Sequence, residues 1–267
     1  MSRVSWLVAA IAALIVLGAP AAQADNYSFG IASLSPVAGN MSSSRKSNDV
    51  WYDLKWQAVT NLVPVGTFDW YFGMQRFDMY AALGGIPAGL ISGYDKHGNI
   101  IPNLEGGTFD ATASMEFAVA KDIKKPGTSY YPGGQTPAYD PPAGDIGLAG
   151  SFDLSSITFS AGGGALTLSG VLNIITAQSD FVDFPNTMPI VITVGKISNN
   201  VPGQNNFIQK YVDFAKGGAG TVNFDGATGT ATGGSVEAAP EPATLLLMGS
   251  GLIGALGWRR RRRRRAA

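Results

Sequence analysis

Short runs of β-branched and aromatic residues alternate with polar residues between positions 25 and 239, and Gly, Pro, Asn and Asp bound most of these runs. The clearest alternation lies in residues 51–60, where Tyr52 and Leu54 share one parity and Asp53 and Lys55 the other. Alternation with a period of two is typical of a strand that buries one face. This segment is therefore predicted to be a β-strand.

Further segments combine the same composition with turn residues at their ends. They are residues 67–72, 112–119, 155–160, 165–175, 189–197, 207–214 and 221–224. Gly162, Gly163 and Gly164 separate two of them and predict a hairpin turn, because glycine adopts the positive φ that such turns require. Residues 74–83 also fit a short helix. Several short strands joined by turns predict a mainly β fold, a single β-sandwich or jelly-roll-like domain over residues 25–225.

Two stretches have the composition of irregular chain. Residues 35–48 are mostly small and polar and are predicted to form a mobile loop. From residue 217 onward the chain is rich in Gly, Thr and Ala, which predicts a last strand followed by a flexible linker over residues 226–239.

Residues 124–144 form a second predicted loop, rich in proline and glycine, that carries Tyr130, Tyr131 and Tyr139. We interpret this segment as a surface excursion of the domain. The alternative is a ligand-binding loop whose exposed tyrosines stack on sugar rings.

The N-terminal residues 1–24 have the features of a secretory signal peptide. Arg3 supplies a positive charge, and residues 6–17 form an apolar run. Ala22 and Ala24 make a small-x-small cleavage site, so we expect cleavage after Ala24. The alternative is an uncleaved membrane anchor, for which the apolar run is short.

The C-terminal residues have the features of a membrane-inserted tail. Residues 243–258 carry no charge and, at about 1.5 Å per residue, would span roughly 24 Å as a transmembrane helix. Trp258 lies where an interfacial aromatic residue belongs. Seven arginines follow: Arg259, Arg260, Arg261, Arg262, Arg263, Arg264 and Arg265. Such a cluster stops translocation and stays cytoplasmic, which predicts an inner-membrane precursor with its domain outside.

Pro240, Glu241 and Pro242 precede this helix directly. A Pro-Glu-Pro element, a Gly-containing apolar helix and a terminal basic cluster, in this order, make residues 238–267 resemble the PEP-CTERM sorting signal. The alternative is a plain stop-transfer anchor.

The resemblance implies how the protein is processed. In that family a membrane-embedded cysteine protease, exosortase, is thought to recognise the Pro-Glu-Pro element and remove the helix. Its members occur mainly in Gram-negative bacteria that make extracellular polysaccharide, and their domains are diverse. The expected partners are the Sec translocon, exosortase and, for the mature domain, exopolysaccharide. The expected location is the cell surface or the extracellular biofilm matrix.

The balanced net charge of the whole chain hides the acidic net charge of the domain. The whole chain has 19 basic and 19 acidic residues, but residues 25–239 hold 11 basic and 18 acidic ones, a net charge of −7. An acidic domain disfavours nucleic acid as a partner. The chain has no cysteine, which excludes cysteine nucleophiles, thiolate metal sites and disulfide-linked oligomers.

The sequence predicts no catalytic residues. His97 is the only histidine and lies in a polar stretch that predicts a turn, without a Gly-x-Ser-x-Gly elbow to accompany it. A glycosidase needs two carboxyls about 5–10 Å apart. Carboxylates of this kind are Glu105, Asp110, Glu116, Asp180 and Asp183, but no spacing rule selects a pair.

No cofactor and no metal site are predicted. Calcium is the alternative, because loops of extracellular β domains hold it with carboxylate oxygens. Asp140, Asp145 and Asp153 lie in one loop region, and Asp180 and Asp183 in another. No EF-hand or RTX-type repeat accompanies them.

The sequence thus favours an exported, non-catalytic structural or adhesive domain. The alternative is a carbohydrate-binding module or adhesin for exopolysaccharide, and a glycoside hydrolase or lyase is a third hypothesis.

Overall fold

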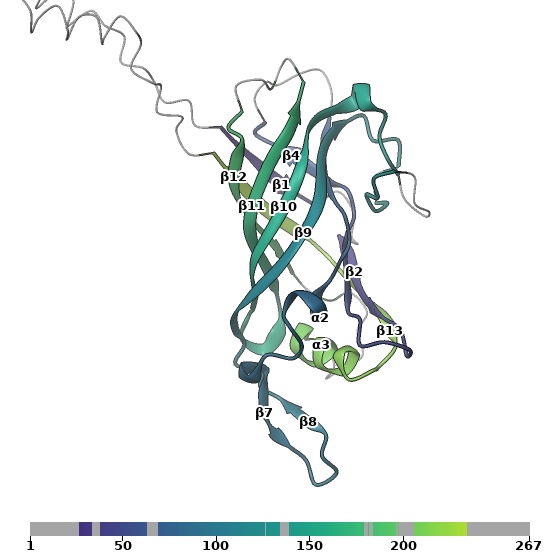
Figure 1. Ribbon diagram of the computed structural model, residues 1–267, viewed down its shortest axis with the longest axis vertical. Helices are drawn as coiled ribbons and strands as arrows, with labels where there is room; N and C mark the ends of the chain where they lie inside the picture. The colour runs from purple at the N-terminus through teal and green to yellow at the C-terminus, as the bar shows by residue number, and fades with distance from the viewer. Residues whose placement is uncertain are drawn as a thin grey trace, which may run out of the picture. The chain divides into compact units, whose positions relative to one another are not determined.

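The computed structural model describes residues 27–33, 38–62, 69–125, 127–133, 139–178, 184–195 and 206–233, with Phe181 and Ile197. Its largest sheet is a closed barrel of antiparallel strands (Figure 1). In barrel order the strands are β1 (Ser28–Ala32), β14 (Ala227–Thr232), β12 (Thr187–Val194), β11 (Leu166–Ala177), β10 (Ile146–Phe159), β9 (Gly107–Lys121), β5 (Trp70–Met74) and β4 (Gln57–Thr60). β4 pairs with β1 and closes the circle.

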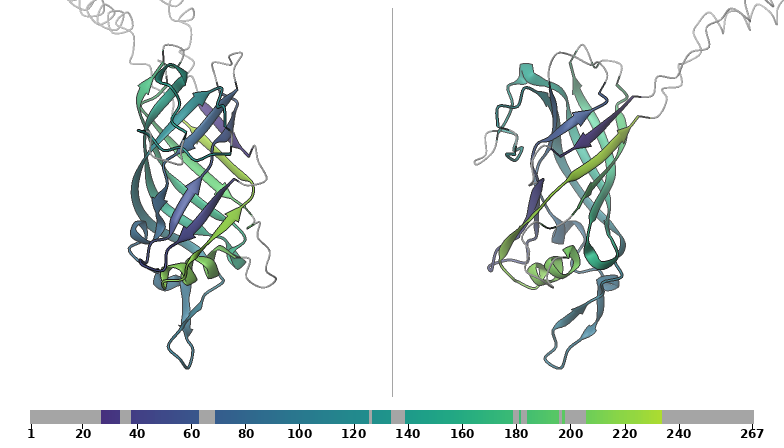
Figure 2. Two further views of the ribbon diagram at one scale, coloured as in Figure 1. Left: turned by 90° about the vertical axis from the view of Figure 1, so that its right-hand side faces the viewer. Right: turned by 180° about the vertical axis from the view of Figure 1, so that it is seen from behind.

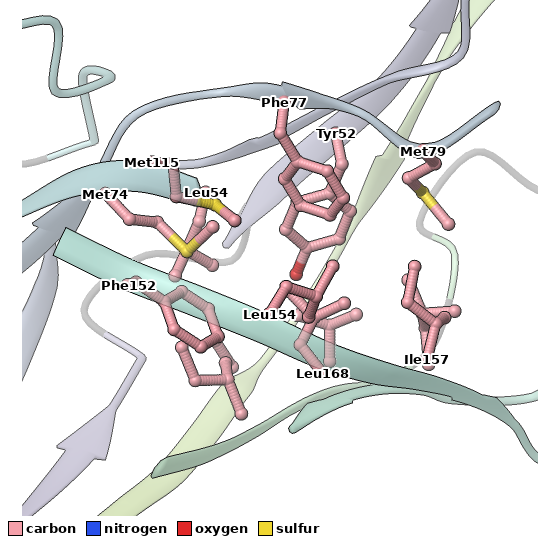
Figure 3. Packing of buried hydrophobic residues seen from close by; sticks show 14 of the residues in the cluster. Tyr52, Leu54, Met74, Phe77, Met79, Met115, Phe152, Leu154, Ile157 and Leu168 are labelled. Carbon is pink, nitrogen blue, oxygen red and sulfur yellow. The ribbon is translucent and has the colours of Figure 1, made fainter. Parts of the chain in front are cut away.

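A second sheet has the strand order β13-β2-β3-β6. Its strands are β13 (Gly220–Phe224), β2 (Gly39–Ser43), β3 (Trp51–Leu54) and β6 (Phe77–Asp78). The buried residues of this sheet belong to the same core as those of the barrel. In Figure 3, Tyr52 and Phe77 of the second sheet point toward Leu154 and Leu168 of the barrel. The smaller sheet therefore faces the barrel strands across one shared core.

The mainly β fold is confirmed, and the arrangement of its strands is corrected. A closed barrel with a second, smaller sheet takes the place of the predicted β-sandwich or jelly roll. The reason is the pairing of β1 with both β14 and β4, which leaves the larger sheet without a free edge.

A register shift explains why only part of β10 was visible as a strand in the sequence. Phe152 and Leu154 are buried on one parity, and Ile157 and Phe159 on the other. The pairing with both neighbours shifts between Leu154 and Ser156, where a bulge moves the buried face by one residue. The predicted segment 155–160 is only the last part of a much longer strand.

The predicted turn between β10 and β11 is confirmed. Residues Ala161–Gly163 form a 3₁₀ turn, η3, in which Gly162 and Gly163 have φ of 72° and 64°. Side chains other than glycine are disfavoured at these angles. The other 3₁₀ turns are η1 (Ala88–Leu90) and η2 (Ala143–Asp145).

The predicted strand over residues 207–214 is wrong, because these residues form the helix α3 (Phe207–Ala215). The helix buries Phe207, Ile208, Tyr211 and Val212, whose spacing of three and four residues places them on one side. Its N-cap is Asn206, whose side chain accepts a hydrogen bond from the Gln209 amide. Aromatic and β-branched residues on the buried side gave this helix the composition of a strand.

Two smaller elements lie at the same end of the barrel as α3 (Figures 1 and 2). The short helix α2 (Met79–Ala82) lies inside the predicted ambiguous segment and is capped by the Asp78 carboxylate. The strands β7 (Ile91–Tyr94) and β8 (Ile100–Pro102) form a projecting two-stranded hairpin. The hydroxyl of Tyr211 in α3 donates to the Gly85 carbonyl at 2.7 Å and ties the helix to this region.

One predicted loop and one predicted linker contain strands. The predicted mobile loop over residues 35–48 includes β2, which pairs with β13 and β3. The predicted linker over residues 226–239 includes β14, which lies between β1 and β12. The chain enters and leaves the barrel side by side, since the Gly233 amide donates to the Tyr27 carbonyl at 2.6 Å.

The predicted signal peptide with Ala22 and Ala24, and the predicted tail from Pro240 to Arg265, lie outside the described residues. Among the residues that are described, no helix is long and apolar enough to cross a membrane.

Candidate functional site

The tyrosines of the proline-rich loop are not the exposed platform that the sequence suggested. Tyr130 and Tyr131 are only 4% and 6% exposed, and Tyr139 is half-buried. The Tyr130 ring packs 5.1 Å from that of Trp56, and burial, followed by the charges of Asp140 and Glu116, raises the pKa of Tyr130 to about 12. The exposure that the alternative of sugar stacking assumed for Tyr130 and Tyr131 is therefore wrong.

Backbone hydrogen bonds fix this loop against the residues that follow β3. The Trp56 amide donates to the Thr128 carbonyl at 3.0 Å, and Lys55 forms an isolated β-bridge with Ser129. The Tyr139 amide donates to the Ser129 carbonyl at 3.2 Å. Residues 127–133 are thus held beside the second sheet and bring Ser129 and Tyr131 to its surface.

The residues that gather there form what we call the Arg76 cluster: Arg76, Trp51, Tyr131, Asp53, Ser129 and Asn40. Arg76 lies between β5 and β6, and its side chain is exposed. Its Cζ lies 4.6 Å from the ring centroid of the half-buried Trp51 and 5.4 Å from that of Tyr131. Two aromatic rings attract and orient a cation at these distances.

Asp53 is the buried acid of this cluster, with an exposed fraction of 9%. Its Oδ2 accepts hydrogen bonds from Ser129 Oγ at 2.5 Å and from Asn40 Nδ2 at 3.4 Å. Its Oδ1 is buried without a hydrogen-bond partner. Burial raises the pKa of Asp53, and the two hydrogen bonds and the charges of Lys55 and Arg76 only partly offset this effect.

The guanidinium of Arg76 is not neutralised by an acid within the described part of the chain, where the one ion pair joins Lys121 and Asp145. Tyr131 is its hydrogen-bonded neighbour, and its charge opposes the rise that burial causes in the pKa of Tyr131. The cluster therefore combines an exposed, oriented guanidinium with an aromatic surface and a buried polar edge. Such an arrangement can bind an oxyanion or a polar ring, since arginine offers five N–H donors in a planar fork.

The other predicted site residues that the structure describes form no common site. His97 is exposed in the turn of the β7–β8 hairpin, as predicted. Asp110 and Glu116 are both exposed on β9 and, six residues apart along the strand, are separated by roughly 20 Å. Glu105 is exposed in the turn before β9. Asp180 and Asp183 lie outside the described residues.

The carboxylates considered for calcium each have their own partners. Asp140 accepts from the Gly133 amide at 2.9 Å, and Asp145 lies 3.9 Å from the Lys121 ammonium. Asp153 accepts from the side chains of Ser114 and Asn173, both at 2.6 Å. In the ranges that the structure describes, no group of three or more acidic or histidine side chains is placed to hold a metal ion.

Trp51, Asp53 and Arg76 were not predicted as site residues. One signal was present: Asp53 stands between the apolar residues Tyr52 and Leu54, where a carboxylate is costly to bury. Arg76 is also the only basic residue between Lys55 and Lys96. Nothing in the sequence indicated that residues 51, 76 and 131 meet.

Comparison with known proteins identifies one segment of the chain. Residues 238–263 match the family model of the PEP-CTERM protein-sorting motif. The match confirms the predicted resemblance of the tail, including Pro240, Glu241 and Pro242, and indicates an exported protein sorted by exosortase. No curated protein and no solved structure gives a match.

Proposed function

We propose that this chain, which carries a PEP-CTERM sorting motif, is an exosortase-sorted protein whose barrel is a non-catalytic structural or adhesive domain of the cell surface or extracellular matrix. The observation that carries the proposal is the motif at residues 238–263. The predicted route is export through the Sec translocon, anchoring in the inner membrane by the predicted helix 243–258, and processing at Pro240, Glu241 and Pro242.

The packing of the barrel supports a structural or adhesive role. Its interior is occupied by apolar side chains, among them Phe152 and Leu168, which are fully buried (Figure 3). A small barrel filled in this way is a rigid core rather than a container for a polar substrate. The polar groups that can meet a partner therefore lie on its outside.

Carbohydrate binding is the second candidate function. The observation that favours it is the Arg76 cluster, where the half-buried Trp51 lies beside the exposed Arg76 guanidinium. Aromatic rings flanked by hydrogen-bonding groups are general features of sites that orient polar ligands.

The intact mass of the protein from membrane and medium fractions of its native host tests the proposed function. We expect a species that starts at Asp25 and ends near Pro240 to Pro242. A membrane-bound species that retains Arg259 to Arg265 would show that the tail is a permanent anchor, and a cytoplasmic species that retains residues 1–24 would contradict export.

A further inference from the structure

The Arg76 guanidinium is held in place before any ligand binds. The ring centroids of Trp51 and Tyr131 lie 4.6 Å and 5.4 Å from its Cζ, and Tyr131, a residue of the proline-rich loop, is itself buried. Because the flanking rings restrict the long side chain, less conformational entropy is lost when its N–H groups bind a ligand.

Among the described residues, no carboxylate forms an ion pair with this guanidinium. Asp53 is the acid within the cluster, but its Oδ2 is occupied by Ser129 and Asn40. Burial also disfavours the charged form of Asp53 and makes it a weak counter-ion for Arg76. Arg76 is hydrogen-bonded to Tyr131, and the other N–H donors of its exposed guanidinium can bind an external oxyanion.

The surroundings of Arg76 favour a carboxylate on a sugar ring over a bare inorganic anion. A single arginine fork matches a carboxylate with two parallel hydrogen bonds. The half-buried Trp51 ring beside it offers an apolar surface to the C–H groups of a sugar. The half-buried Asn40, which lies opposite Asp53 in the second sheet, supplies an amide for ring hydroxyls.

We propose that the Arg76 cluster binds the carboxylate of an acidic sugar residue, with Arg76 as its anchor and Trp51 as its apolar wall. This inference rests on carbohydrate binding as a function of the barrel. It extends that function by assigning a site and a class of sugar. Lys55, which follows β3 and whose charge acts on Asp53, adds positive potential to the same surface.

Calorimetric titration of the protein purified from its host tests the site. The probes are trigalacturonate, triguluronate and trimannuronate, with neutral cellotriose and inorganic phosphate as comparisons. We expect at least one uronate to bind, and both comparison probes to bind at least about tenfold more weakly. Arg76→Gln should weaken uronate binding roughly 10- to 100-fold, because hydrogen bonds to a charged group are lost.

The matched control is Lys96→Gln, which removes one positive charge from the exposed turn of the β7–β8 hairpin. It should leave the affinity within about twofold. Arg76→Lys keeps the charge but loses the planar fork, so its affinity should fall between those of the wild type and Arg76→Gln. Because Arg76 is exposed, circular dichroism should show the same fold in every variant.

The failures of the two proposals are distinguishable. Uronate binding that Arg76→Gln leaves unchanged, or phosphate binding as tight as uronate binding, would overturn the proposed site. Equal binding of cellotriose would leave carbohydrate binding standing and overturn the acidic class. Absence of binding to every probe would overturn the inference, while the masses of the processed protein would still decide sorting and export.

Discussion

The hydroxyl of Ser129 donates a 2.5 Å hydrogen bond to the carboxyl of Asp53, 76 positions earlier in the chain. The bond joins the proline-rich loop to β3 of the second sheet, beside the bridge between Lys55 and Ser129. It also satisfies part of a carboxyl whose other oxygen has no partner. One buried acid therefore adds to the backbone hydrogen bonds that hold the loop, and with it Tyr131, beside Arg76.

Ser129→Ala should lower the free energy of unfolding by about 1–3 kcal/mol, because it removes a hydrogen bond from a buried polar group. Ser155→Ala is the control, since the exposed Ser155 hydroxyl on β10 donates a 3.0 Å hydrogen bond to the Ser169 carbonyl on β11. Its effect should stay within about 0.5 kcal/mol. Urea denaturation followed by tryptophan fluorescence measures both. Equal effects of the two variants would show that the bond to Asp53 has no special role.

Asp53 should make the stability of the wild type fall as pH rises. Burial raises the pKa of Asp53 in the folded state. The cost of burying its charge is absent below the pKa of the unfolded chain, about 4, and is complete above the folded pKa. Asp53→Asn removes this cost, so the stability of the variant relative to the wild type should rise between pH 4 and pH 7. Each unit of raised pKa corresponds to about 1.4 kcal/mol.

Thermal unfolding at several pH values measures this difference. Asp95→Asn is the control of opposite sign, because hydrogen bonds from Asn99 hold the pKa of Asp95 below its usual range. The benefit from Asp95 is present above the unfolded pKa and is lost as pH falls through the folded pKa. The stability of Asp95→Asn relative to the wild type should therefore not rise between pH 4 and pH 7. A relative loss of stability for Asp53→Asn over this range would contradict the expectation.

Phe152→Ala should destabilise the barrel by about 3–5 kcal/mol, because Phe152 is fully buried and the truncation leaves a cavity (Figure 3). Ile175→Ala on the neighbouring strand β11 is the control, since Ile175 is 78% exposed. It should change the free energy of unfolding by less than about 0.5 kcal/mol. Chemical denaturation compares the two. A small effect at Phe152 would mean that the barrel interior is not the main core.

Glu241→Gln should impair processing of the tail if exosortase reads the Pro-Glu-Pro element. The expected result is an increased fraction of membrane-bound protein that retains the arginine cluster. Glu237→Gln removes the same charge four residues upstream, just before the matched segment 238–263, and should be processed like the wild type. Western blots of membrane and medium fractions measure the ratio. Identical processing of both variants would argue against recognition through Glu241.

The strands that the sequence predicted well are those with local signals. Period-two alternation marked residues 51–60 as extended chain, although the structure divides the one predicted strand into β3 of the second sheet and β4 of the barrel. The three glycines marked the turn between β10 and β11. The helix α3 was missed because its buried side is made of residue types that favour strands as well. The bulge at Leu154 and Ser156 hid the length of β10, because it breaks the alternation in the middle of the strand.

The closure of the barrel and the Arg76 cluster had no local signal at all. Closure depends on β1 pairing with β14, about 200 positions later in the chain. The cluster joins β3, the connection before β6 and the proline-rich loop. The resemblance of the tail was found because its three parts are contiguous and each depends on residue type rather than on folding.

The hydrogen bond between Tyr27 and Gly233 marks the end of the described barrel, so cleavage of the C-terminal tail should not affect the stability of the fold. Every residue of β14 is already paired with β1 or β12, and the described barrel ends at Gly233, upstream of Pro240. A protease that cuts near Pro240 would break no bond of the barrel ladder. Such a cut should therefore require no refolding of the domain, and its melting temperature should be the same before and after the cut.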